Sequence, residues 1–142
     1  MNISLQSKGY KEAIRALKRN PRELKKLQKK GLQRIALIGI NIIQDRTADG
    51  QGYKDGAFKP YSESYAAFRN NKGRTLTPNL KMSGKMIAAM TSKANDKQAE
   101  IFFRGKNASE KAAYNNQTRP FFGFKFVSTA VIGATLAAIF IR

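Results

Sequence analysis

A long uninterrupted helix starting at Asn20-Pro21 is the strongest structural signal in the chain. Asn20 is a good N-terminal cap, Pro21 suits the first helical position, and Glu23 lies three residues after the cap. Apolar residues and one glycine then recur at spacings of three and four, namely Leu24, Leu27, Gly31, Ile35, Ile38 and Ile42. The pattern predicts a helix over residues 21–45, about 37 Å long at 1.5 Å per residue. Its second half is apolar on nearly all sides and is expected to be buried.

The first half of this helix is basic. Between Lys8 and Arg34 there are eleven Lys or Arg and two Glu, and the 142-residue chain has a formal net charge of +18. A shorter helix over 10–19 is expected to precede the long one. A charge this large favours an anionic partner, with nucleic acid as the first candidate and an anionic membrane as the second.

Lysines spaced three or four residues apart line a helix face that can contact phosphates without reading the base sequence. The residues predicted to face double-stranded DNA are Arg22, Lys25, Lys26, Lys29 and Lys30. Two alternatives remain for this surface. It is a solvated helix face with no partner, or it pairs with an acidic protein.

The rest of the pattern predicts one domain over residues 1–142 with short helices and one clear strand. Polar, glycine-rich stretches at 46–60 and 70–79 are expected to be loops, and the first of them mobile. The expected elements are a short helix after Ser62, a helix from Ser83 to about Ser92, a strand over 97–104 and a helical turn over 109–116 capped by Ser109. The predicted fold class is therefore α+β, with a long N-terminal helix and shorter helices packed on a small antiparallel sheet.

An apolar segment closes the sequence. Residues 126–141 contain no charged side chain and are bracketed by Lys125 and Arg142. As a helix they would cover about 24 Å, which is short of the roughly 30 Å hydrocarbon core of a bilayer. A buried helix or strand is therefore favoured over a membrane span. The first ten residues lack an apolar stretch, so no secretory signal is expected.

The composition excludes several kinds of chemistry. The chain has no Cys and no His, so thiolate nucleophiles, imidazole bases and the usual zinc ligands are missing. Asp45, Asp49 and Asp55 gather near one loop, but they lack the one-three-five spacing of a calcium loop. No phosphate-binding loop motif is present. We therefore expect no enzyme activity, no catalytic residues, no cofactor and no metal.

Several short motifs resemble, in order and spacing, the virion-morphogenesis or tail-completion proteins of tailed phages. They lie within residues 32–124 and read Phe58-Lys59-Pro60-Tyr61-Ser62, Leu80-Lys81-Met82-Ser83-Gly84-Lys85-Met86, Ile101-Phe102-Phe103, Ala113-Tyr114-Asn115-Asn116 and Arg119-Pro120-Phe121-Phe122-Gly123-Phe124. The resemblance implies a non-enzymatic virion component of α+β fold at the head–tail junction, assembled in the host cytoplasm. Such proteins form homo-oligomeric rings and contact portal or adaptor proteins, tail proteins and the double-stranded DNA that passes through.

Within that hypothesis the aromatic cluster Phe121, Phe122 and Phe124, followed by residues of 127–141, is the candidate oligomer interface. The alternative for these side chains is packing in the core of the domain. The alternative function for the chain is a free nucleic-acid-binding protein without sequence preference. No small-molecule substrate is expected in either case.

Overall fold

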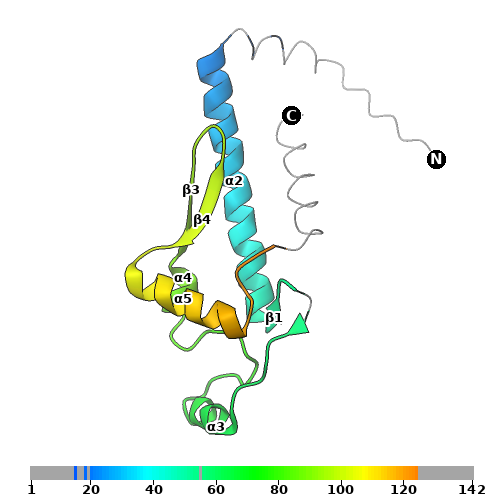
Figure 1. Cartoon of the computed structure of the whole chain (residues 1–142), viewed down its shortest axis with the longest axis vertical. Coiled ribbons are helices and arrows are strands. Elements are labelled where there is room, and N and C mark those ends of the chain that lie inside the picture. The colour runs from blue at the N-terminus through cyan, green and yellow to red at the C-terminus, as the bar shows by residue number, and fades with distance from the viewer. Residues whose placement is uncertain (1–14, 16–17, 19, 55, 125–142) are drawn as a thin grey trace, which may run out of the picture.

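A long helix forms the axis of the molecule. The computed structural model describes residues 15, 18, 20–54 and 56–124, and its first complete element is α2 (Pro21–Ala48) (Figure 1). The backbone N–H of Glu23 donates to Asn20 Oδ1 at 3.3 Å, and Pro21 occupies the first turn. The predicted helix and its start are confirmed, and the helix continues past residue 45 to Ala48. The segment 126–141 and, apart from Arg15 and Lys18, the helix expected over 10–19 lie outside the described residues.

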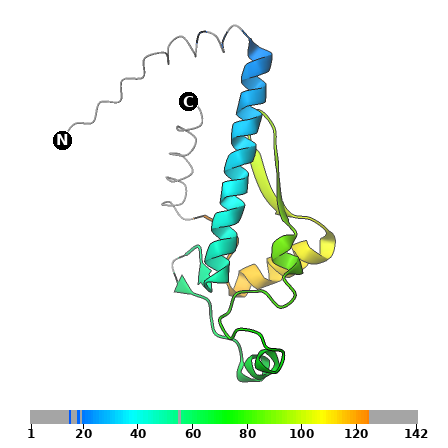
Figure 2. The ribbon, with the colours of Figure 1, turned by 180° about the vertical axis from the view of Figure 1, so that it is seen from behind.

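An antiparallel hairpin lies along α2 (Figures 1 and 2). It consists of β3 (Met90–Ala94) and β4 (Ala99–Phe103), with Met90 opposite Phe103 and Ala94 opposite Ala99. The tight turn is held by Asn95, whose Oδ1 accepts from the N–H groups of Lys97 and Gln98 at 2.8 Å each. β4 confirms the predicted strand, and Ala99 and Ile101 on it alternate with Glu100, whose carboxylate pairs with Lys93.

The helix predicted from Ser83 to Ser92 is wrong in its second half. Helix α4 covers only Lys85–Ala88 and follows Gly84, which has a φ of +77° that favours glycine. From Met90 onward the chain is extended and bonds to β4. The local pattern of methionines suggested a helix, but pairing with the strong apolar strand overrides it.

The last described helix is longer than predicted. Helix α5 covers Lys106–Thr118 and follows Gly105, which has a φ of +85°. The predicted cap at Ser109 is therefore wrong, because the helix begins a turn earlier at the glycine. Ala112 on its inner side is 3% exposed and joins the core.

The connection between α2 and α4 contains more structure than the predicted loops. Two short strands, β1 (Gln51–Gly52) and β2 (Gly56–Ala57), pair within the stretch expected to be a loop over 46–60. Helix α3 (Glu63–Asn71) follows Ser62 as predicted, although the Ser62 side chain makes no capping bond. Both views place α3 at the end of the molecule opposite the start of α2 (Figures 1 and 2).

The core lies where the C-terminal half of α2 meets the hairpin, α4 and α5. Its buried apolar members are Ile40, Ile43, Phe58, Ile87, Met90, Ala112 and Phe121. On α2 the buried face passes through Ala36, Ile40, Ile43 and Thr47. This is a different side from much of the stripe that the sequence predicted: Ile35, Ile38 and Ile42 are only half-buried, and Leu27 is exposed. Helix α2 therefore has a second apolar side, which the core does not cover. The order of helices and strands confirms the predicted α+β fold class.

Candidate nucleic-acid interface

All five predicted DNA-facing residues lie exposed on the first three turns of α2. Arg22, Lys25, Lys26, Lys29 and Lys30 all project into solvent. These turns form the end of the described molecule farthest from α3 (Figure 1). The structure thus brings the five cations together on one rod-like element, and we call them the basic face of α2.

The helix geometry spreads these cations along a broad strip. At about 100° per residue, Arg22, Lys26 and Lys29 lie within about 60° of one another around the axis, and Lys25 and Lys30 lie on either side. From Arg22 to Lys30 the strip is about 12 Å long. Duplex DNA carries one charge per roughly 1.7 Å of its axis, so this length runs past about seven phosphate charges.

Few acidic groups neutralise the basic face in the described residues. Lys26 Nζ lies 3.0 Å from Glu23 Oε1, and Lys25 Nζ lies 4.0 Å from Asp96 Oδ2. Both lysine side chains are 69% exposed. Solvated pairs of this kind contribute little and are screened by salt, so the lysines remain available to a stronger anion.

The hairpin adds a cation that sequence spacing did not indicate. The contact between Lys25 and Asp96 places the hairpin turn beside the basic face, and the next residue, Lys97, is exposed. Gln33 supports this arrangement from within α2, because its Nε2 donates to Ser92 Oγ at 2.8 Å. The only sequence signal was the charge of Lys97 itself, since its position depends on how the hairpin packs.

This arrangement can bind a phosphate backbone electrostatically. Exposed ammonium groups act as mobile point charges, which suits contact with phosphates and gives no readout of bases. Among the described residues no three acidic side chains gather in a way that could hold a metal ion. None of the described helices is both long and apolar enough to cross a bilayer.

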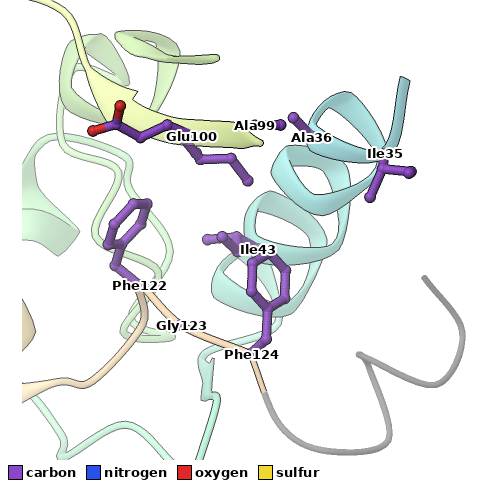
Figure 3. Close-up of a pocket in the computed structure, with 9 residues that line it drawn as sticks. Ile35, Ala36, Ile43, Ala99, Glu100, Phe122, Gly123 and Phe124 are labelled. Carbon is purple, nitrogen blue, oxygen red and sulfur yellow. The ribbon is translucent and has the colours of Figure 1, made fainter. Parts of the chain in front are cut away.

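The aromatic interface predicted from the sequence is only partly accessible. Phe121 is fully buried in the core, so it is wrong as an anchor for a second subunit. Its ring packs against Phe103 and Phe122 with centroid distances of 6.1 and 6.2 Å. Phe122 and Phe124 are half-buried and line an open groove beside α2 (Figure 3). For these two residues the interface remains a prediction.

The segment Arg119–Phe124 forms hydrogen bonds with α2 and with the connection that follows it. Arg119 donates from Nε to Lys59 O at 3.0 Å and from Nη2 to Pro60 O at 3.1 Å. Pro120 O accepts from the N–H of Tyr53 at 3.0 Å. This part of the resemblance therefore marks a structural joint between α5, the short β1–β2 hairpin and α2.

Arg46 holds the same segment against α2. Its Nη2 donates to the carbonyls of Phe121 and Gly123, both at 2.8 Å. Desolvation lowers the pKa of the Arg46 guanidinium, which nevertheless stays charged because the ordinary pKa of arginine lies far above neutral pH. Nothing in the sequence indicates this role, since Arg46 is the first residue of the stretch predicted to be a loop.

Arg69 is the other arginine whose role only the structure reveals. The side chain is 1% exposed, although α3 lies at the edge of the molecule. Its guanidinium donates to Thr75 O at 3.0 Å, to Lys81 O at 3.3 Å and to Asn79 Oδ1 at 3.4 Å. It also lies over the ring of Tyr61, at 4.8 Å from the centroid. Arg69 thus organises the loop over 72–82.

Comparisons with known proteins leave the family open. No protein-family model matches the sequence, and searches of curated proteins and of solved structures also return no match.

Proposed function

We propose that this protein is a non-enzymatic structural component of a tailed-phage virion. In this proposal it is a ring-forming neck or tail-completion protein that joins the head connector to the tail and turns the basic face of α2 toward DNA. The observation that carries the proposal is the exposed, weakly neutralised basic face. The ordered motifs within 32–124 supply the phage context.

The charge distribution suits a protein that contacts DNA without holding it at one sequence. Phosphate contacts give affinity in any register, so DNA can slide past a ring whose lumen carries such contacts. The same charge opposes assembly of a ring, because copies of a +18 chain repel one another. DNA in the lumen or acidic neighbouring proteins would offset that repulsion.

Subunit contacts need exposed apolar surface that the core does not use. The described structure offers aromatic side chains on α3 and α5: Tyr65 is 37% exposed, Phe68 46% and Tyr114 70%. Aromatic side chains are enriched at protein interfaces because they bury a large area at low entropic cost. We place a ring contact at this aromatic end of the molecule, remote from the basic face.

A free nucleic-acid-binding protein without sequence preference is the second candidate. The observation that favours it is that the basic face is complete within one chain and needs no second subunit. The two candidates differ in assembly. The first predicts a closed ring, alone or with connector proteins, and the second predicts binding by a monomer or dimer.

A charge-neutralised variant tests the shared part of both candidates. In the helix variant Arg22, Lys25, Lys26, Lys29 and Lys30 are all changed to Gln, and in a matched control the exposed Lys72, Arg74, Lys85, Lys106 and Lys111 are changed instead. Both variants lose five charges, so the total charge is matched. We expect duplex DNA binding to fall much further in the helix variant. Equal losses would refute a localised interface.

Native mass spectrometry, at low and high salt and without detergent, separates the two candidates. The neck proposal predicts a ring of defined mass, formed alone or after addition of connector proteins. A chain that stays monomeric under all these conditions, while still binding DNA, would favour the free binder. In a phage that carries the gene, the helix variant is also expected to reduce retention of packaged DNA, and unchanged retention and infectivity would contradict a lumenal basic face.

A further inference from the structure

An apolar groove of about 400 Å³ runs beside α2. Its walls come from Ile35, Ala36 and Ile43 of α2, from Ala99 and Ile101 of β4, and from Phe122 to Phe124 (Figure 3). Among the described residues of the lining only Glu100 is charged, and its carboxylate pairs with Lys93 at 3.0 Å. The groove therefore offers hydrocarbon surface with almost no polar partner, which favours an apolar occupant.

The groove continues onto the second apolar side of α2. Ile35 lines the groove, and Ile38 and Ile42 lie on the same side of the helix at spacings of three and four. These residues are half-buried rather than part of the core. Toward the N-terminal end, Leu24 and Leu27 extend the same stripe. The stripe from Leu24 to Ile42 is about 27 Å long.

The described chain ends in the wall of this groove. Arg46 binds the carbonyls of Phe121 and Gly123 near the C-terminal end of α2. One residue later, the Phe124 ring lies against Gly39, where an added Cβ would be 2.8 Å from Phe124 Cζ. The contacts with α2 thus move from Arg46, at Phe121 and Gly123, to Gly39 at Phe124, which is toward the N-terminal end of α2.

We propose that residues 126–141 of the same chain fill this groove as a helix antiparallel to α2. The sixteen uncharged residues would span about 24 Å, which matches the stripe on α2. Only Lys125 separates the segment from Phe124, so the segment is present at a very high effective concentration at its own groove. A neighbouring copy has to compete with this tethered segment, and for that reason we assign the groove to the segment of its own chain.

This inference does not rest on the proposed function. It changes one expectation of the sequence analysis, in which 127–141 and the flanking Phe122 and Phe124 formed a subunit interface. If the segment covers its own groove, these two rings become interior contacts. Ring contacts then fall to other surfaces, such as the exposed aromatic residues of α3 and α5.

Engineered disulfides test the assignment without background, because the chain has no cysteine. In antiparallel helices the numbers of facing residues have a constant sum. The contact of Phe124 with Gly39 sets this sum at 163, which places Ser128 opposite Ile35. The test pair is Ile35→Cys with Ser128→Cys. The control pair is Arg34→Cys with Ser128→Cys, because Arg34 is exposed and points about 100° away around α2. Each full-length double variant is oxidised at low protein concentration and examined on a denaturing gel.

We expect the test pair to form an intramolecular disulfide in most molecules and the control pair to form far less. Disulfide-linked dimers or ladders from the test pair would place the segment in a neighbour's groove and overturn the assignment. An absence of preference between the two pairs would overturn it as well. Because cysteine variants can fold poorly, hydrogen exchange of the unmodified full chain provides a second test: the amides of 126–141 should be protected in the detergent-free monomer, and rapid exchange there would refute a docked helix.

Discussion

Replacing Arg69 should destabilise the protein more than any other change of a single charged residue that we consider. The side chain is 1% exposed, and in Arg69→Met the carbonyls of Thr75 and Lys81 lose their donor. Hydrogen bonds to a charged group contribute about 1.5–3 kcal/mol each, and the contact with Tyr61 adds roughly 1 kcal/mol. Methionine recovers part of the packing. We expect a loss of about 3 kcal/mol in the free energy of unfolding, which corresponds to a fall in melting temperature of about 10 °C.

Urea unfolding followed by circular dichroism measures this loss. Arg74→Met is the matched control, because Arg74 is exposed and the chemical change is identical. It should shift the free energy of unfolding by less than about 0.5 kcal/mol. Arg69→Lys is expected to fall between the two, since an ammonium cannot reproduce the planar set of donors. If Arg69→Met is as stable as the control, the carbonyl contacts contribute nothing to the fold and the reasoning fails.

Two further predictions concern the joint around Pro120 and Gly123. Gly52→Ala should lower stability by about 1–3 kcal/mol, because the new Cβ would lie 2.8 Å from Pro120 O, a backbone atom that cannot rotate away; Gly56→Ala, directly opposite in the hairpin, meets no atom within 4 Å and should be nearly neutral in the same urea assay. Arg46→Gln should release the segment held at Phe121 and Gly123, seen as faster hydrogen exchange after residue 120 while α4 stays unchanged. Unaltered exchange there would show that Arg46 does not anchor the segment.

The start of α2 could be predicted from the sequence because its signals are local. The cap, the proline and the apolar spacing act within one or two turns, and the structure shows all of them. The strand β4 was recognisable for a similar reason, since Ala99, Glu100 and Ile101 alternate between apolar and polar and two phenylalanines follow. The exposure of the basic face also followed from sequence, because a run of lysines on a helix has few buried partners available.

The features that could not be predicted depend on contacts distant in sequence. Strand β3 forms because β4 offers it a partner, and its own residues do not indicate a strand. The guanidinium of Arg69 can be buried because the carbonyls of Thr75 and Lys81 accept its hydrogen bonds. The sequence around these two residues does not indicate where their carbonyls lie. The sequence predicts Phe121 at an interface because a run of aromatic residues has the same sequence pattern whether its side chains pack inward or outward. Only the meeting of α2, β4 and α5 decides that it is core.

The salt dependence of DNA binding tests the central claim most directly. The claim is that the basic face of α2 contacts the phosphate backbone. For B-DNA the logarithm of the binding constant falls with the logarithm of salt concentration with a slope of about −0.9 for each phosphate neutralised. Changing Arg22, Lys25, Lys26, Lys29 and Lys30 to Gln should therefore make the slope shallower by about 3–5, and the five-residue control should change it much less. Parallel salt titrations for the wild-type chain and the helix variant would contradict the account.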